Sequence, residues 1–110
     1  MGKDLQRMMK QAQKMALDMQ RAQEELADQE VEGSAGGGAV KAVVTGDQRV
    51  VRVEIDPSVF DGEPDSDDIE MLGDTVTAAV NDALDKAREM QAEALGPLAG
   101  GMGGLGLPGM

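Results

Sequence analysis

Five basic side chains near the start of the chain have the types and the spacing of a phosphate-binding surface. They are Lys3, Arg7, Lys10, Lys14 and Arg21. Successive members of this set are 4, 3, 4 and 7 residues apart. Positions three or four apart lie on one face of an α-helix, so a helix would align all five in a basic stripe. A row of Lys and Arg alone favours contact with a nucleic-acid backbone and little readout of its bases. The alternative interpretation is an ordinary solvated helix face.

The charge balance confines any nucleic-acid contact to this region. The chain has a formal net charge of −11. Residues 1–23 hold five basic and two acidic side chains, which gives +3, whereas residues 24–110 hold five basic and nineteen acidic ones, which gives −14. The sequence therefore predicts that double-stranded DNA contacts the N-terminal segment, while the rest of the chain repels phosphate.

The composition argues against catalysis, metal binding and cofactor binding. Cys, His, Trp and Tyr are absent, and Phe60 is the only aromatic residue. The chain therefore has no thiol or imidazole for nucleophilic or acid–base catalysis, no Cys/His metal ligands and no disulfides. It also lacks the aromatic platforms on which single-stranded nucleic acids stack. We expect a binding protein without catalytic residues, cofactor or small-molecule substrate.

Two short patterns look like ligand motifs but fail in their context. The run Gly101–Gly106 fits the dinucleotide fingerprint G-x-G-x-x-G, yet the chain continues for only four residues, too few for the helix that the motif opens. The alternating acids from Asp61 resemble a calcium loop, but its sixth position holds Ser66 and its twelfth holds Leu72, where Gly and Glu are required. We expect no metal site and a solvated acidic loop.

A long helix is predicted to carry the basic stripe. Between Lys3 and about Glu30 there is no Gly, Pro or β-branched residue. Apolar residues follow an unbroken 3, 4 spacing, the a/d seam of a heptad repeat, at Leu5, Met8, Ala12, Met15, Met19, Ala22 and Leu26. The five bases then occupy positions c and f, away from the seam. A helix of roughly 42 Å exceeds what one small domain can cover, so the seam predicts a homodimer through Leu5, Met8, Ala12, Met15 and Met19. For the C-terminal half of the seam, the alternative to pairing between chains is packing against the core of its own chain.

The segment after this helix has the pattern of a β-hairpin. Val40–Thr45 and Val50–Ile55 are rich in β-branched residues and flank Gly46–Arg49. A four-residue loop would place Val44 opposite Val51 and Lys41 opposite Glu54, which avoids a like-charge pair of Lys41 with Arg52. We therefore expect this register.

A second helix is predicted to cover the hairpin. It would be capped by Ser66 or Asp67 and would carry an apolar stripe from Ile69 to about Leu95. We expect residues 1–95 to form one domain and the Gly-rich residues 96–110 to be a disordered tail. The charged N-terminus and the lack of an apolar run of eighteen residues predict a cytoplasmic protein without a membrane partner.

Several strings along residues 3–95 are similar to those of one known family. They are the Met/Gln-rich first helix, Gly36–Ala42, Val51–Ser58 with its V-x-I-D-P-S string, Glu70–Leu72, and Ala78–Leu84 with the string A-A-V-N-D-A-L. In these strings and in their order the chain resembles the YbaB/EbfC family of bacterial nucleoid-associated proteins. We interpret Asn81 and Asp82 as residues of helix packing or of the dimer contact, because Asp repels phosphate.

The resemblance implies an α+β protomer of α-β-β-β-α order and a tweezer-like homodimer that binds double-stranded DNA at the nucleoid. The third strand follows from the resemblance alone and would have to come from Val31–Ala35. The expected function is a DNA-binding, nucleoid-associated homodimer of low sequence selectivity that influences nucleoid organisation and gene expression. The alternative is a non-enzymatic protein-interaction or chaperone-like helical dimer, because Met-rich seams adapt to protein partners.

Overall fold

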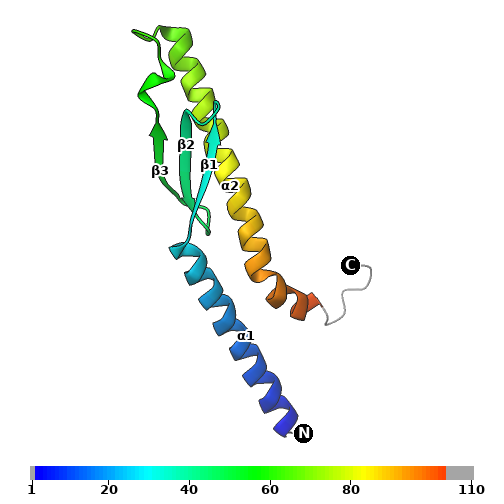
Figure 1. The fold of residues 1–110 in the computed structure, drawn as a ribbon. Coiled ribbons are helices and arrows are strands. Elements are labelled where there is room, and N and C mark those ends of the chain that lie inside the picture. The colour runs from blue at the N-terminus through cyan, green and yellow to red at the C-terminus, as the bar shows by residue number, and fades with distance from the viewer. Residues whose placement is uncertain (1, 104–110) are drawn as a thin grey trace.

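The fold joins two helices to a three-stranded antiparallel sheet, which confirms the α+β class. The computed structural model describes the backbone of residues 2–103 and the side chains of residues 2–96. In chain order the elements are α1 (Gly2–Asp28), β1 (Glu30–Ala35), β2 (Val40–Thr45), β3 (Val50–Ile55), a short 3₁₀ turn (Pro57–Val59) and α2 (Ser66–Gly103). The molecule measures 76 × 31 × 18 Å along its principal axes. Figure 1 shows α2 lying along one face of the sheet, and α1 leaving the end of the sheet that is opposite to the start of α2.

The two halves of α1 have different surroundings. Every side chain from Lys3 to Lys14 is exposed, whereas Met15, Met19 and Ala22 are half-buried. Leu26, the last residue of the heptad seam, is only 1% exposed. The C-terminal half of α1 thus packs within its own chain, where it contacts α2 and β2. The first half of the helix has no such cover.

The sheet has the order β1-β2-β3, and its first strand is the one that the family resemblance implied. Lys41 lies opposite Glu54 as predicted, but Val44 lies opposite Val50 and not Val51. The loop is the reason. Thr45 donates its N–H to the carbonyl of Arg49 at 2.8 Å, which closes a three-residue loop in place of four. Such loops need a residue with positive φ, supplied by Gln48 at 70°, and a β-bulge in β3 then restores the register.

The core lies between β2 and α2. Val40, Ala42 and Val44 all point to the helix and are fully buried, as the strand pattern predicted. Opposite them, α2 presents small side chains, which are Ala79, Ala83 and Ala87. Because alanine is small, the helix axis lies close to the sheet, and β1 meets it with Gly33, where no side chain intervenes.

The start of α2 is capped by a residue other than the two that we predicted. The helix begins at Ser66, and the carboxylate of Asp65 accepts the N–H of Asp68 at 2.8 Å. In return the carboxylate of Asp68 accepts the N–H of Asp65 at 3.1 Å. This reciprocal pair satisfies two free donors at once. Asp67 and Glu70 have the same spacing, but both lie inside the helix, which already begins at Ser66.

α2 also extends beyond its predicted end. It continues to Gly103, eight residues past Leu95. The predicted disordered tail, residues 96–110, thus begins within this helix, and residues 104–110 lie outside the part of the chain that the structure describes.

We still expect residues 96–110 to be dispensable for folding. The last fully buried residue of α2 up to Gly96 is Ala87, and the side chains that follow it there are half-buried or exposed. Truncation after Leu95 should therefore change the melting temperature by less than about 3 °C. Thermal unfolding followed by circular dichroism measures this change, and a larger fall would mean that the removed segment packs against the domain.

Candidate nucleic-acid interface

The predicted basic stripe is fully accessible on α1. Lys3, Arg7, Lys10, Lys14 and Arg21 are all exposed. The first and last of them are 18 residues apart, so the stripe is roughly 27 Å long. This length matches roughly eight base pairs of DNA, since successive pairs rise by about 3.4 Å. The structure therefore brings all five predicted residues together on one helix, as their spacing requires.

None of these five bases forms an ion pair with another described residue, whereas most of the other bases of the chain do. Within the described residues the ion pairs are Arg52 with Glu30 and Glu54, Lys86 with Asp82, and Arg88 with Asp85. None of them includes a base of α1. The side chains of the stripe are therefore available for phosphate oxygens.

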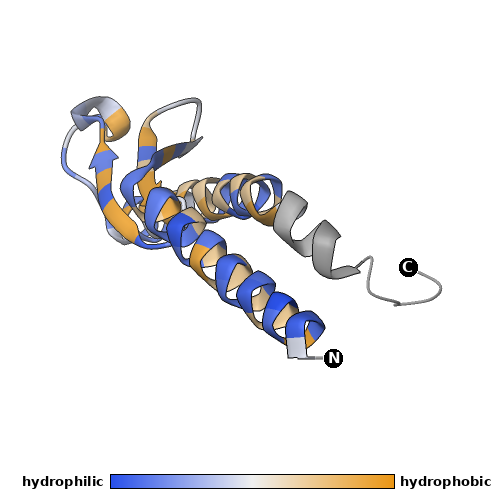
Figure 2. Ribbon diagram, turned by 90° about the horizontal axis from the view of Figure 1, so that it is seen from below, coloured by the Kyte–Doolittle hydropathy of each residue, from blue (hydrophilic) through white to orange (hydrophobic). Residues whose placement is uncertain are grey.

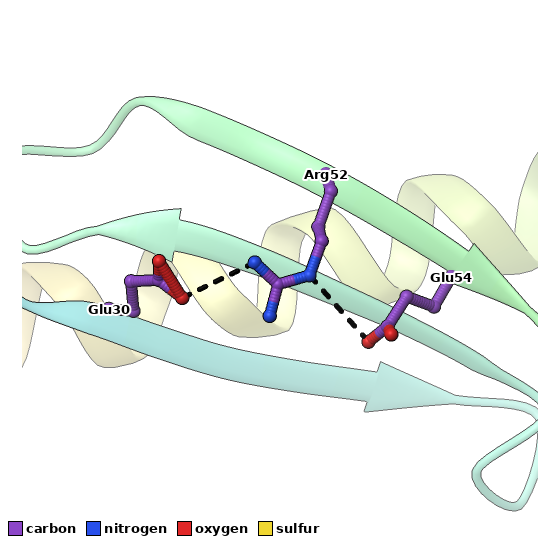
Figure 3. A network of polar contacts seen from close by, with 3 residues as sticks. All are labelled: Glu30, Arg52 and Glu54. Atoms are coloured by element: carbon purple, nitrogen blue, oxygen red, sulfur yellow. Dashed lines mark hydrogen bonds and ion pairs between the residues drawn. The ribbon is translucent and has the colours of Figure 1, made fainter.

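Arg52 illustrates the contrast on the outer face of the sheet, which α2 does not cover. Figure 3 shows its guanidinium reaching across β2, 3.3 Å from a carboxylate oxygen of Glu30 and 4.0 Å from one of Glu54. Val43, opposite Arg52 in the register, is only 4% exposed beneath this network. The network covers an apolar residue and carries more acids than bases, so this face does not suit phosphate.

One residue in the middle of the stripe is not basic. Leu17 is three residues after Lys14 and four before Arg21, so it completes the 4, 3 spacing of the stripe at the one position where a base is missing. It is 55% exposed. The pattern of charges alone does not include Leu17, although the same 4, 3 spacing identifies its position. Figure 2 shows that hydrophobic and hydrophilic residues alternate along the exposed surface of α1.

The opposite end of the molecule is strongly acidic. Residues 56–74 contain eight carboxylates and no Lys or Arg. Among them, Asp56 accepts hydrogen bonds from the backbone N–H and the hydroxyl of Ser58, which hold its pKa below the usual value. The described residues contain no cluster of carboxylates arranged to hold a metal ion. This end of the chain therefore repels phosphate and leaves α1 as the candidate interface.

Asp82 has a structural role that agrees with our interpretation of it as a packing residue. Its carboxylate accepts the N–H of Ser34, on the free edge of β1, at 3.0 Å. It also lies 3.1 Å from the ammonium of Lys86. The hydrogen bond from Ser34 is the main cause that lowers the pKa of Asp82, and the hydrogen bond from Lys86 lowers it further. Asp82 thus fixes α2 to the edge of the sheet.

The fold is shared with a protein of known structure. An uncharacterized protein of Helicobacter pylori superposes with a TM-score of 0.70 at 20% identity, over 84% of this chain and 92% of that one. In the part of this chain that the structure describes, no helix combines the length and the apolar character needed to cross a membrane.

Comparisons of the sequence extend over nearly the whole chain. Nucleoid-associated proteins of Rhodococcus opacus and Streptomyces avermitilis are each 50% identical over 107 residues, which is 97% of this chain and 91% of each relative. A nucleoid-associated protein of Pelotomaculum thermopropionicum is 49% identical over 93% of both chains. The model of the YbaB/EbfC DNA-binding family matches residues 1–102. The chain therefore belongs to the YbaB/EbfC DNA-binding family.

Proposed function

We propose that this protein binds double-stranded DNA as a homodimer through the basic stripe of α1. One observation carries the proposal: five exposed bases line one face of a helix that extends away from the rest of the fold, and none of them forms an ion pair with another described residue. Because Lys and Arg in such a row reach phosphates and not base edges, sequence selectivity is low. The stripe comprises Lys3, Arg7, Lys10, Lys14 and Arg21.

The relatives support this proposal. Their names are those of nucleoid-associated proteins, and the family is described as DNA-binding. We infer that this chain acts in the same way, at the nucleoid within the cytoplasm and without catalysis. By binding along DNA it contributes to nucleoid organisation and thereby influences gene expression. The negative charge of the body opposes the contact, so binding is weak at physiological salt.

Strand β3 supports the homodimer. α2 covers β1 and β2 but makes few contacts with β3. Val53 and Ile55 lie opposite the fully buried Ala42 and Val40, so they share the core face of the sheet. They nevertheless remain 36% and 44% exposed. An apolar edge strand beside an open core face is prone to aggregate unless it is covered. A second copy of the chain supplies that cover.

The heptad seam supplies a further contact between the two copies. Leu5, Met8 and Ala12 are exposed, and Met15 and Met19 are half-buried. The seam therefore keeps an apolar surface on the part of α1 that its own chain does not cover. In the proposed tweezer-like dimer, β3 joins the two bodies and the seam lies along the arms. The basic stripe then stays on the outer positions of the helix.

We expect the double substitution Val53→Thr and Ile55→Thr to dissociate the dimer. Threonine keeps the β-branched shape that strands favour but adds a hydroxyl to the apolar face. The dimer dissociation constant should rise by roughly tenfold or more, while the circular-dichroism spectrum stays unchanged. Sedimentation equilibrium measures the constant.

Two further variants make the dimer experiment specific. Met8→Gln with Met15→Gln tests the seam and should weaken the dimer to a smaller extent. Leu17→Gln removes an exposed apolar side chain outside both surfaces and should leave the dimer unchanged. A dimer that tolerates the changes in β3 and in the seam would contradict the proposed interface.

A DNA titration at several salt concentrations tests the proposed function. If the dimer makes about four to six phosphate contacts, log affinity should fall with log salt at a slope of roughly −4 to −5, since each phosphate contributes about −0.9. Affinity should differ little between duplexes of unrelated sequence. Binding that is independent of salt would contradict the phosphate contact, and no binding at low salt would favour the protein-interaction alternative.

A further inference from the structure

One apolar side chain lies within the basic stripe of α1. Leu17 is 55% exposed, three residues after Lys14 and four before Arg21. It shares position f of the heptad with Lys3 and Lys10, so it belongs to the face of the stripe and not to the seam. Contact with phosphate alone does not explain a leucine here, because an isobutyl group offers phosphate neither charge nor a hydrogen bond.

The helix beneath Leu17 is held by its own chain. Met15 and Met19, two residues before and after Leu17, are half-buried and lie on the opposite face of α1. This half of the helix contacts α2 and β2. Every side chain from Lys3 to Lys14, in contrast, is exposed. Leu17 therefore projects to solvent from a braced part of the helix, which can hold it in position against a ligand.

The charges around Leu17 favour a polyanion. Asp18 is the only acid among residues 14–21, and it is half-buried at position g. The next acid on the face of the stripe, Glu24, comes after Arg21 and marks the end of the stripe. Leu17 thus lies between two exposed cations, with no exposed carboxylate between them.

The spacing of these two cations fits the two strands of a duplex. Lys14 and Arg21 are seven residues apart, which is two turns and roughly 10 Å along the helix, with Leu17 between them. The minor groove of B-DNA is about 6 Å wide. Where α1 crosses this groove, the two long side chains reach phosphates on its opposite walls, and Leu17 meets the edges of the base pairs.

We propose that Leu17 inserts between base pairs from the minor groove and kinks the DNA that the basic stripe binds. Inserted leucines partly unstack a base step and bend the duplex by about 20 to 90°. The inference rests on the proposed function, because the phosphate contacts of Lys14 and Arg21 bring Leu17 to the duplex. An apolar wedge reads no hydrogen bonds, so low sequence selectivity is retained.

Circularisation of a short DNA fragment by a ligase tests the proposal. A fragment of about 150 base pairs closes slowly, because it is no longer than the persistence length of DNA. Bends introduced by the wild-type protein should raise the rate of closure by roughly tenfold or more. Leu17→Gln keeps the helix and every charge but removes the wedge. It should bind with the wild-type salt slope and raise the rate of closure little.

Three further variants separate the wedge from charge and from general apolar character. Leu17→Met keeps an apolar wedge and should promote closure like the wild type. Leu17→Arg supplies the missing base, so the salt slope should steepen by about 0.9 for each phosphate gained while closure is no longer promoted. Met9→Gln removes another exposed apolar side chain of α1, 57% exposed but outside the stripe, and should promote closure like the wild type.

A duplex with a central mismatch gives an independent measurement. Unstacking costs less at a mismatch, so the wild-type protein should bind this duplex roughly threefold to tenfold more tightly than the matched one. Leu17→Gln should bind the two duplexes equally. Fluorescence anisotropy measures both affinities, and sedimentation checks that each variant remains in the oligomeric state of the wild type.

The outcomes separate this proposal from the proposed function. If the wild type binds DNA with the expected salt dependence but does not promote closure, the wedge is wrong and the proposed function stands. The same holds if Leu17→Gln promotes closure as well as the wild type, because the bend then comes from neutralised phosphates. No DNA binding at low salt would overturn both.

Discussion

Reversal of Lys10 and Lys14 to Glu is expected to abolish DNA binding and to leave the dimer intact. Both side chains are exposed on the face of α1 that is opposite to the heptad seam. In the proposed dimer the two substitutions replace four cations by four anions, so the centre of each stripe repels phosphate and the three remaining bases of each chain are largely neutralised. Affinity at low salt should fall by at least about 100-fold, and the slope of log affinity against log salt should flatten toward zero.

A matched variant separates the stripe from the overall charge of the protein. Arg49→Glu with Arg88→Glu changes the net charge by the same amount, at exposed positions outside α1. The ion pair of Arg88 with Asp85 is exposed, so its loss has little effect on stability. This variant should keep most of the affinity and the wild-type salt slope.

Fluorescence anisotropy with a labelled duplex measures both quantities, and sedimentation checks that each variant remains a dimer. If the α1 variant and its matched control lose the same affinity, DNA responds to net charge and the stripe has no special role. Wild-type affinity after reversal of Lys10 and Lys14 would place the DNA contact on another part of the molecule.

The elements of the fold could be predicted wherever local residue types determine them. The absence of Gly, Pro and β-branched residues from Lys3 to Glu30 predicted α1, and the Val-rich runs predicted β2 and β3 within their observed bounds. β1 contains Gly33 and Ser34, which have little strand preference, so only the family resemblance indicated it. Its strand conformation is imposed by pairing with β2 and by packing against α2.

Details that depend on distant or competing contacts were not predictable in the same way. The register near Val44 depends on whether Gln48 adopts positive φ, a choice that the residue types alone leave open. The cap of α2 required a choice among neighbouring acids, and the reciprocal pairing of Asp65 with Asp68 decided it. The contact of Asp82 with Ser34 joins residues 48 positions apart.

The candidate site was predictable in its positions but not in its accessibility. The spacing of the bases placed them on one helix face, yet only the fold shows that α1 extends from the body with these residues exposed. The open face of β3 was not foreseen, because the apolar strand pattern gives no sign that α2 leaves this strand uncovered. The dimer contacts therefore stay predictions.

Substitution of Gly33 by Ala is expected to destabilise the fold strongly. A Cβ atom built at this position would lie 2.2 Å from the backbone nitrogen of Ala83, 2.6 Å from its Cα and 2.8 Å from the carbonyl oxygen of Ala79. All three are backbone atoms of α2, so no side chain can rotate away. The helix must therefore move away from β1, which opens the core around Ala79 and Ala83. The same movement lengthens the hydrogen bond from the N–H of Ser34 to the carboxylate of Asp82.

The expected loss is about 3 kcal/mol in the free energy of unfolding, at the upper end of the cost of overpacking. For a domain of this size it corresponds to a fall in melting temperature of roughly 12 to 24 °C.

Gly73→Ala is the matched control, because a Cβ there meets nothing within 4 Å and the residue is exposed on α2. Alanine favours the helix over glycine by about 1 kcal/mol, so this variant should be as stable as the wild type or more stable. Urea unfolding at one protein concentration measures both changes, which avoids the dependence of dimer stability on concentration. If the midpoint for Gly33→Ala equals that of the wild type, α2 does not pack against β1 as closely as the structure shows.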